Sequence, residues 1–465
     1  MRKVNLLGIL VVFICSSLPV CAQSVFIVDR LTDTGEGSGL MGDLRYCITN
    51  GTSGQDTITF GITGTINLTG ALPELHTSVT IAGPGADQLT VRRDTGGNYR
   101  IFTVTGNTTT VVISDLTVAN GRTTQGGGVY VYSGNLTLSS SILSDNQAVG
   151  ANGPYPGGPG QSGMGGGIYV DGGVVSVQKT TLSNNRATGG DGGPGLFGYG
   201  GYGGFGAPGL GGGIYVAGGT VSVTDTTLTN GQATGGNGGV GGSGFMCGVG
   251  GPGALGLGGG IYVAGGSVEV FQNTLSANGS RGGDGGQGGT TVEGLCPGGE
   301  GGNGIGGGLL VSGGDVEVQH STLFANQATG GSGGVGEGYG PDGQGMGGGL
   351  SFNMGTLRTR NTILAGNMAQ TTARDLSGNL GSLGHNLIGN STGGSGFDAT
   401  DLLDVNPRLG PLQDNGGPTL THALLEGSPA MDAGDNTDAP EFDQRGEGFP
   451  RIVNDIIDIG AFEVQ

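Results

Sequence analysis

Three carboxylates in the second half of the chain are the best candidates for acid–base chemistry. Glu269 and Glu317 occupy the same position of two successive sequence repeats, and Asp315 lies two residues before Glu317. If the repeats stack, the two glutamates lie about 5 Å apart, near the spacing of a retaining glycoside hydrolase pair. The alternative is a solvated charge ladder in which Arg358 of the next repeat neutralises Glu317. Outward strand positions are ordinarily charged, and no insertion forms the wall of a cleft here. The three carboxylates are therefore weak catalytic candidates.

A second set of oxygen-bearing side chains could bind calcium. The same offset in five repeats supplies amide, carboxylate or hydroxyl oxygens, which are the ligands that Ca²⁺ prefers. The flanking tracts lack the Gly-Gly-x-Gly-x-Asp nonapeptide of calcium-binding solenoids. The alternative to calcium binding is that these side chains cap turns of the backbone. Ca²⁺ is the one cofactor that the sequence leaves open. The column comprises Asn152, Asp191, Asn237, Asp284 and Ser332, with Asp191, Asn237 and Asp284 as weak metal candidates.

The charge balance excludes several classes of partner. The chain has 17 basic and 36 acidic residues, which gives a formal charge of −19. Such a surface repels nucleic acid and anionic lipid. A lyase acting on polyuronates needs grouped positive charge, and no such grouping is visible. We therefore expect no nucleic-acid partner, and we treat a lyase or hydrolase of the pectate-lyase-like β-helix type as the alternative function.

Two cysteines occupy nearly the same place in adjacent repeats. Cys247 lies 11 residues before the glycine triplet that follows it, and Cys296 lies 10 residues before its own. Neighbouring strands of a sheet are about 4.8 Å apart, which is close to the Cα separation of bridged cysteines. The register therefore predicts a Cys247–Cys296 disulfide and leaves Cys47 unpaired and buried.

These residues share a register because the chain is repetitive. Glycine makes up 113 of the 465 residues, and a glycine triplet recurs at spacings of 39 to 48 residues, a length typical of solenoids. Each triplet is followed by two short segments with period-two alternation of apolar residues, separated by a glycine, and then by an invariant leucine. Each pattern indicates a short strand. The triplets begin at Gly126, Gly165, Gly211, Gly258, Gly306 and Gly347.

A column of asparagine and glycine marks one corner of each repeat. These two residue types adopt positive φ most readily, so we expect a left-handed corner here, with asparagines bonded from coil to coil. Three strands and tight corners predict an all-β, three-sided parallel β-helix. The corner ladder comprises Asn146, Asn185, Gly231, Asn278, Asn326 and Asn367.

The rest of each repeat varies in length and contains the excess glycine. These stretches are expected as insertions along one edge of the solenoid. They could be mobile, as glycine-rich linkers are, or they could stack as extended polyglycine helices. The second interpretation is favoured, because the expected disulfide links two of the insertions.

The ends of the chain suggest export and a distinct C-terminal region. Residues 1–22 have the basic start, apolar centre and small residues of a secretory signal, and no later apolar run could cross a bilayer. We expect a secreted or cell-surface protein with four parts. These are a signal peptide (1–22), an N-terminal cap with the first coils (23–125), regular repeats with glycine-rich insertions (126–373) and an acidic C-terminal domain (374–465).

Short motifs outside the repeats resemble known bacterial families. The segment Gly42-Asp43-Leu44-Arg45-Tyr46-Cys47 resembles the N-terminal region of secreted β-helix proteins named for a Cys-Ser-Leu-Arg-Glu-Ala motif. The repeats are similar to polymorphic outer-membrane-protein repeats. Asp414-Asn415-Gly416-Gly417-Pro418, Asp443-Gln444-Arg445-Gly446 and Asp458-Ile459-Gly460-Ala461-Phe462-Glu463 are similar to the choice-of-anchor Q domain, whose members usually carry a C-terminal sorting anchor.

The resemblance implies a secreted right-handed β-helix with no agreed activity. The expected function is therefore an exported structural or adhesive protein that contacts cell-surface or matrix glycans. A column of four tyrosines could stack with sugar rings, although such a column is also an ordinary outward strand face. These are Tyr130, Tyr169, Tyr215 and Tyr262.

Overall fold

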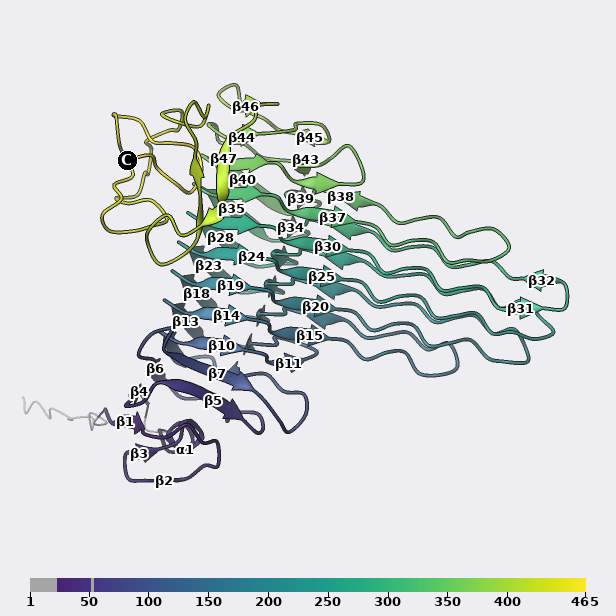
Figure 1. Cartoon of the computed structure of the whole chain (residues 1–465), viewed down its shortest axis with the longest axis horizontal. Coiled ribbons are helices and arrows are strands. Elements are labelled where there is room, and N and C mark those ends of the chain that lie inside the picture. The colour runs from purple at the N-terminus through teal and green to yellow at the C-terminus, as the bar shows by residue number, and fades with distance from the viewer. Residues whose placement is uncertain (1–22, 52–53) are drawn as a thin grey trace, which may run out of the picture.

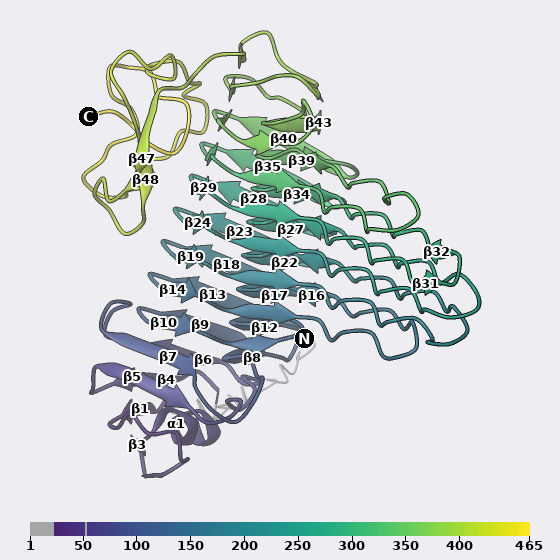
Figure 2. The same cartoon turned by 45° about the vertical axis from the view of Figure 1, so that its right-hand side comes forward.

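The computed structural model describes residues 23–51 and 54–465, and the expected signal peptide lies outside these ranges. Nearly every described element is a strand, and the described helix α1 (Leu44–Asn50) covers the first strands. Within the described part of the chain, no helix has the length and apolar character that a bilayer crossing requires. The successive coils stack along one axis (Figures 1 and 2).

One coil shows how the repeat folds. The second repeat runs through β17 (Ile168–Val170), β18 (Val174–Gln178), β19 (Thr181–Ser183) and β20 (Arg186–Thr188), and it returns from its insertion through β21 (Gly209–Leu210). Each strand pairs in parallel with its equivalents in the neighbouring coils, without a register shift. The structure therefore confirms an all-β parallel β-helix with glycine-rich insertions on one edge.

The equivalent strands form five parallel sheets, numbered I to V in the order in which a coil visits them. Sheet I contains β8 (Phe102–Val104), β12 (Val129–Val131), β17, β22 (Ile214–Val216), β27 (Ile261–Val263), β34 (Leu309–Val311), β39 (Leu350–Phe352), β43 (Leu376–Asn379) and β45 (Gly394–Ser395). Sheet II contains β1 (Val25–Val28), β3 (Met41–Gly42), β4 (Asp56–Phe60), β6 (Val79–Ala82), β9 (Thr110–Ser114), β13 (Asn135–Ser139), β18, β23 (Thr220–Thr224), β28 (Ser267–Phe271), β35 (Asp315–Gln319) and β40 (Thr356–Arg360), with β2 (Gly37–Ser38) antiparallel at its edge. Sheet III contains β5 (Gly64–Leu68), β7 (Leu89–Arg93), β10 (Thr117–Ala119), β14 (Ile142–Ser144), β19, β24 (Thr227–Thr229), β29 (Thr274–Ser276), β36 (Thr322–Phe324), β41 (Ile363–Ala365), β44 (Leu387–Ile388) and β46 (Leu402–Leu403).

Sheets IV and V flank the insertions on either side. Sheet IV contains β11 (Arg122–Thr123), β15 (Gln147–Val149), β20, β25 (Gln232–Thr234), β30 (Gly279–Arg281), β37 (Gln327–Thr329) and β42 (Met368–Ala369). Sheet V contains β16 (Gly163–Met164), β21, β26 (Gly256–Leu257), β33 (Gly304–Ile305) and β38 (Gly345–Met346). Two antiparallel hairpins complete the fold, β31 (Thr290–Thr291) with β32 (Gly294–Leu295), and β47 (Leu409–Gln413) with β48 (Thr421–Leu424).

The core is a stack of equivalent apolar side chains from sheets I, II and III. The leucine that recurs in sheet III is buried in every repeat, as are the inward residues of the other two sheets apart from the partly buried Phe352. Each coil buries these residues only against its neighbours, as expected for a solenoid. The glycine between the first two strands has a positive φ in all six repeats, so it makes the turn that the sequence indicates.

The asparagine ladder is present, but its backbone is not left-handed. Each pair of stacked asparagines is joined by a side-chain hydrogen bond, for example Asn146 Nδ2 to Asn185 Oδ1 at 3.0 Å and Asn278 Nδ2 to Asn326 Oδ1 at 2.9 Å. The expectation of positive φ at these positions is wrong, because the left-handed residue lies one position earlier. There the side chain faces away from the core and several residue types are accepted, namely Asp145, Asn184, Asn230, Ala277, Ala325 and Gly366.

The sheets continue past residue 374 before the chain folds back. Strands β43 to β46 add to sheets I and III, so the acidic C-terminal region begins inside the solenoid. The remaining residues, 405–465, return along sheet III and lie beside its strands (Figure 2). Gln444 Nε2 donates to Thr227 Oγ1 at 3.0 Å, and Thr274 Oγ1 donates to Gln444 Oε1 at 2.7 Å. This segment therefore covers the outward face of sheet III over several coils.

Candidate functional site

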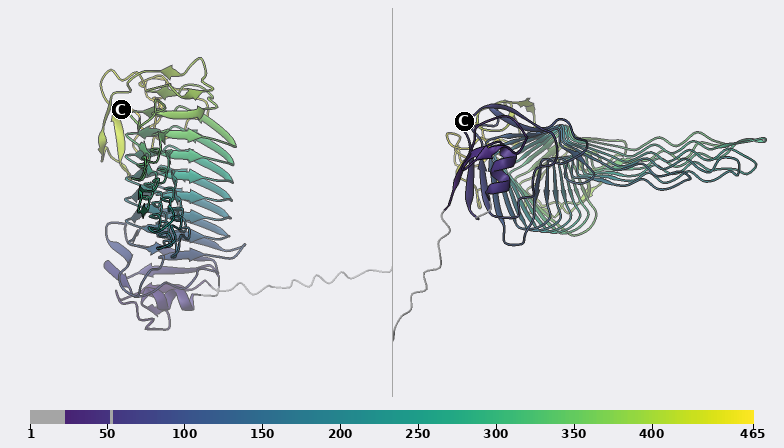
Figure 3. Two further views of the ribbon diagram at one scale, coloured as in Figure 1. Left: turned by 90° about the vertical axis from the view of Figure 1, so that its right-hand side faces the viewer. Right: turned by 90° about the horizontal axis from the view of Figure 1, so that it is seen from below.

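The glycine-rich insertions form an ordered two-layer array that projects from one edge of the solenoid (Figures 1 and 3). We call it the polyglycine array, and it comprises residues 150–162, 189–208, 235–255, 282–303 and 330–344. In each insertion an outgoing segment leaves the solenoid and a returning segment comes back beside it. Within the outgoing layer, Gly192 N donates to Asn237 O and Gly238 N donates to Asp284 O, both at 2.8 Å.

The two layers are also joined to each other. Gly204 N of a returning segment donates to Gly193 O of its outgoing partner, and Gly239 N of the next insertion donates to Gly204 O, both at 2.8 Å. Extended polyglycine helices have no internal hydrogen bonds, so these contacts between segments satisfy the backbone. The structure therefore favours stacked polyglycine helices over mobile linkers.

The packing explains why the recurring triplets in these segments contain two glycines and one other residue. A Cβ on Gly193 would lie far inside van der Waals contact with the carbonyl oxygen of Pro154, and one on Gly239 would meet the carbonyl oxygen of Gly193 in the same way. The third residue of each triplet faces away from the array and can carry a side chain. The array is therefore a flat backbone platform that displays one side chain in three.

The displayed side chains differ between the two layers. In the outgoing layer, the column nearest the solenoid is entirely polar. In the returning layer the displayed residues are mostly aromatic, aliphatic or proline, with a few polar exceptions such as Glu300. The apolar ones include Pro159, Tyr202, Phe205, Pro208, Val249, Pro252, Leu255, Pro297 and Pro341.

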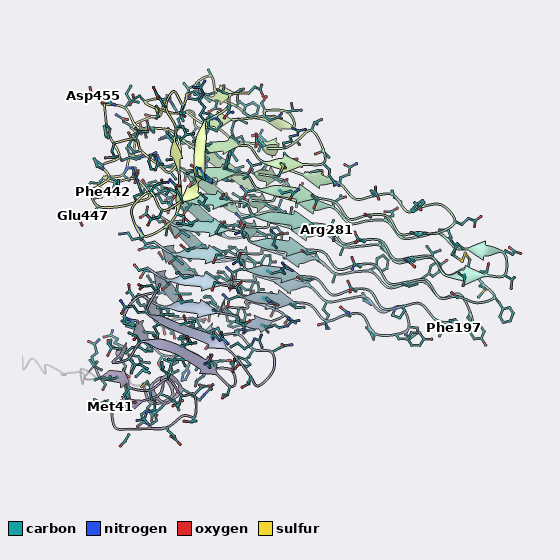
Figure 4. The ribbon with its side chains drawn as sticks, in the orientation of Figure 1. Met41, Phe197, Arg281, Phe442, Glu447 and Asp455 are labelled. Atoms are coloured by element: carbon teal, nitrogen blue, oxygen red, sulfur yellow. A yellow bond between two sulfur atoms is a disulfide. The ribbon has the colours of Figure 1, made fainter. Side chains whose placement is uncertain are left out.

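The exposed aromatic side chains of the described residues are concentrated on this array. Tyr132 is the one exposed aromatic residue of the described chain that lies outside it. Phe245 near the distal end is 91% exposed and Phe197 is 74% exposed, and Figure 4 shows Phe197 at the distal end and Arg281 at the base. Because soluble proteins rarely leave clustered apolar side chains in water without a use, the array is the strongest candidate for an interaction surface. The other exposed aromatics of the array are Tyr155, Tyr199, Tyr202, Phe205 and Tyr339.

A disulfide joins two insertions near their distal ends. Cys247 and Cys296 are bonded, with Cα atoms 5.4 Å apart, which confirms the pairing expected from the register. Cys47 is free and lies on the buried face of α1, and burial raises the pKa of its thiol to about 12. The cross-link fixes the two insertions that carry Phe245 and the β31–β32 hairpin relative to each other.

The oxygen column considered for calcium is occupied by backbone contacts. The side-chain oxygen of Asp191 accepts from Asn237 N at 2.7 Å, and that of Asn237 accepts from Asp284 N at 2.8 Å. Asp284 in turn accepts from Ser332 N and pairs with Arg281. Nowhere in the described ranges do three or more His, Cys, Asp or Glu side chains gather as they would around a metal ion. Apart from Ser332, each side chain of the column therefore satisfies the backbone N–H of the equivalent residue in the next insertion.

The three candidate catalytic carboxylates lie on the outward face of sheet II. Glu269, Glu317 and Arg358 are aligned on adjacent strands, as the register requires. Glu269 is exposed and accepts from Ser222 Oγ at 3.2 Å, and the group lines a shallow hollow of about 270 Å³ with Asp315. Among the ion pairs of the described residues, none joins Arg358 to Glu317. The carboxylates are brought together on an open surface.

The corner ladder ends on a buried carboxylate that the sequence pattern does not reveal. Asn326 Nδ2 donates to Asn367 Oδ1 at 3.0 Å, and Asn367 Nδ2 donates to Asp375 Oδ1 at 2.8 Å. Gly231 has no side chain and interrupts the ladder between Asn185 and Asn278. Burial raises the pKa of Asp375 to about 6, although its bonds from Asn367 act in the opposite direction. The corner residues are therefore structural.

A second buried polar ladder runs along the corner between sheets II and III. Thr226 N donates to Asn273 Oδ1 at 2.9 Å, and Asn273 N donates to Ser321 Oγ at 3.1 Å. The signal for it is a column of small polar residues one position after a left-handed residue. That column, which the sequence analysis missed, is Ser141, Thr180, Thr226, Asn273, Ser321 and Thr362.

The tyrosine column forms a stack on the outward face of sheet I. Ring centroids are 4.9 Å apart between Tyr130 and Tyr169, 5.1 Å between Tyr169 and Tyr215, and 5.2 Å between Tyr215 and Tyr262. The guanidinium of Arg100 covers the free face of Tyr130 at 4.6 Å from its centroid. Tyr169 is buried within the stack, and at the other end the buried side chain of Leu310 follows Tyr262 in the column, so the column stabilises this face.

The C-terminal motif residues make dense structural contacts. The guanidinium of Arg445 pairs with Asp443 at 2.7 Å and lies between the rings of Phe449 and Phe462, 3.9 and 3.8 Å from their centroids. Glu463 N also donates to Asp443 at 2.7 Å. These motifs therefore hold the C-terminal segment together rather than lining a cavity.

No family model matches the chain, and no curated protein matches it.

Proposed function

We propose that the protein is an exported structural or adhesive β-helix protein that contacts glycans at a cell surface or in a matrix through its polyglycine array. The observation that carries the proposal is the concentration of exposed aromatic side chains on a rigid, hydrogen-bonded platform. Aromatic rings stack on the apolar faces of sugars, and ring geometry gives them a large contact area at low entropic cost. The disulfide supports export, because such bonds persist in oxidising compartments.

The charge of the chain narrows the class of glycan. With a formal charge of −19, the protein repels uronates and sulfated chains. The returning layer displays almost no charge of its own. Neutral polysaccharides are therefore the proposed partners, and the same charge excludes nucleic acid as a partner.

The family assignment is part of the proposal. We infer that the chain belongs with the secreted β-helix proteins that end in a choice-of-anchor Q domain, with a signal peptide in residues 1–22. In support, the Asp443-Gln444-Arg445-Gly446 segment and residues 458–463 pack against each other and against sheet III.

Retention on insoluble polysaccharides tests the function. The full chain is mixed with cellulose, chitin and mannan, and with pectate as an anionic comparison, and the bound fraction is measured after centrifugation. We expect retention on at least one neutral polysaccharide, and a loss of at least tenfold in Tyr202→Ser/Phe205→Ser. Tyr132→Ser is the matched control, because Tyr132 is exposed but lies outside the array.

Two results would overturn this assignment. Absence of retention on every polysaccharide would remove the adhesive role and leave a structural one. Release of reducing ends or unsaturated products that Glu269→Gln or Glu317→Gln abolishes would instead establish the enzyme that the sequence leaves as the alternative.

A further inference from the structure

The tyrosine stack stops where a hollow opens in the surface of the solenoid. Tyr262 is the last ring, and the next two residues of the column are Leu310 and Ser351. At this point a cavity of about 460 Å³ lies between sheet I and sheet V. Its volume falls within the range of roughly 300–1,000 Å³ typical of small-molecule sites.

The hollow is lined by both apolar and polar side chains. Leu257, Ile305 and Met346 of sheet V lie opposite Leu310 and the Tyr262 ring. Each coil contributes one of these residues, so the apolar wall continues past the end of the stack.

Four polar side chains complete the lining. Among the described residues, their side chains donate and accept no hydrogen bond within the protein, which leaves them free for a ligand. No charged residue lines the hollow. The four are Ser312, Ser351, Asn353 and Ser377.

This combination specifies the chemistry of the ligand. A purely aromatic molecule would use the Tyr262 ring and the aliphatic wall but would leave the four polar groups unpaired. A charged sugar would find no counter-charge. A neutral pyranose has an apolar face for the ring and a rim of hydroxyl groups for the serines and asparagine.

We propose that the hollow is a saccharide-binding site that takes a neutral pyranose stacked on Tyr262. Leu310 takes the next place in the column and is buried, and the sugar ring packs against the part of the Tyr262 ring that extends beyond this shorter side chain. Its hydroxyl groups bind Ser351, Asn353 and Ser377, and Leu310 and Met346 close the apolar side. The site lies on the body of the solenoid, and of the polyglycine array only Leu255, at its base, joins the lining.

Titration of the full chain with methyl glycosides tests the site. Methyl glucoside, methyl galactoside and methyl mannoside are used, with methyl glucuronide as the charged comparison, and binding is followed by ligand-observed NMR. We expect saturable binding of at least one neutral glycoside and none of the glucuronide. Asn353→Ala should weaken that binding several-fold, and Tyr262→Ala should weaken it at least tenfold.

A variant that fills the hollow distinguishes a loss of binding from a loss of folding. Leu310→Tyr extends the tyrosine stack by one ring, so it should fold normally and abolish glycoside binding, while Tyr132→Ser should bind as the unaltered chain does. Wild-type affinity in Leu310→Tyr, absence of any neutral glycoside binding, or binding of p-cresol in the hollow without any sugar would each overturn the proposal. Polysaccharide retention is measured on the same preparations, so loss of one activity without the other shows which of the two proposed sites has failed.

Discussion

At the scale of the residue, buried amides decide how one coil is held to the next. A stacked asparagine satisfies a backbone carbonyl of the preceding coil, and its oxygen accepts the backbone N–H and the amide of that same coil. Asn326 does this fully, since it donates to Leu275 O at 2.9 Å and accepts from Asn278 N at 2.9 Å. The sequence allowed the stacking to be predicted, because a column of identical residues implies contact between copies. It did not allow the backbone conformation to be predicted. Asparagine suits positions with positive φ, but it also suits positions where its side-chain amide bonds to the next coil.

Replacement of Asn326 by alanine should destabilise the solenoid. The variant leaves the buried Asn278 N–H without its acceptor and removes one hydrogen bond each from Leu275 O and the Asn278 amide, and an unsatisfied buried group costs about 1–3 kcal/mol. We expect a loss of about 2–4 kcal/mol and a lower urea midpoint by circular dichroism. Asn107→Ala is the control, because Asn107 is exposed and lies outside the ladder. Equal midpoints for the two variants would show that the ladder does not stabilise the fold.

Asp375 should make stability depend on pH between about 4 and 6. Burial raises its folded-state pKa to about 6, so the folded chain binds the proton more tightly than the unfolded chain does. The stabilisation is complete below the unfolded pKa of about 4 and is lost as pH rises through 6. Asp375→Asn keeps the acceptor for Asn367 and removes the charge. Relative to that of the unaltered chain, the free energy of unfolding of the Asp375→Asn variant should rise by about 1–3 kcal/mol between pH 4 and pH 7. Urea midpoints of the two proteins that change in parallel across this range would contradict the assignment.

At the scale of the element, the polyglycine array replaces side-chain packing with backbone hydrogen bonds between segments. Its existence could be anticipated from the glycine-glycine-x triplets and from the aligned cysteines. Its two-layer arrangement could not, because the sequence does not show which carbonyl each glycine N–H reaches. The role of the oxygen column could not be predicted for the same reason. Its side-chain oxygens could bind calcium or accept hydrogen bonds from neighbouring backbone N–H groups, and the sequence does not distinguish the two.

A single methyl group should open the array locally. The Cβ of Gly239→Ala would collide with the carbonyl oxygen of Gly193, so the third insertion must separate from the second. We expect cleavage by proteinase K within residues 235–255 to accelerate several-fold, with the coils unaffected. Val240→Ala, at the next and outward-facing residue, should be cleaved as the unaltered chain is. Equal rates for both variants would mean that the segments are not closely packed.

At the scale of the whole molecule, the C-terminal segment fastens several coils from one side. Gln444 contacts strands β24 and β29 together, and His422 contacts Ser276 at 2.9 Å. The sequence marked residues 414–463 as a motif-rich region but gave no sign that it folds back, since its partners lie about 170–220 residues earlier. The coils themselves were predictable because their contacts follow the repeat.

Loss of the Gln444 amide should release this segment before the coils unfold. Gln444→Ala leaves Thr227 and Thr274 without their shared partner and removes a buried side chain. We expect a fall of about 1–3 kcal/mol in the free energy of opening residues 405–465, measured by the urea dependence of proteolysis in that segment. Gln413→Ala, at an exposed residue of β47, is the control. The docking model would be wrong if both variants opened alike.

The polyglycine array must be rigid to display its aromatic side chains, and amide hydrogen exchange of the unaltered full chain measures this rigidity directly. Exchange is followed by mass spectrometry with peptides from residues 189–208, 235–255 and 282–303, compared with peptides from sheet II. The hydrogen bonds of Gly192, Gly193, Gly238 and Gly239 predict protection of these insertions by at least a hundredfold over an unstructured chain. Exchange at the unstructured rate throughout the three insertions would contradict the array, and with it the proposed display of aromatic side chains to a glycan.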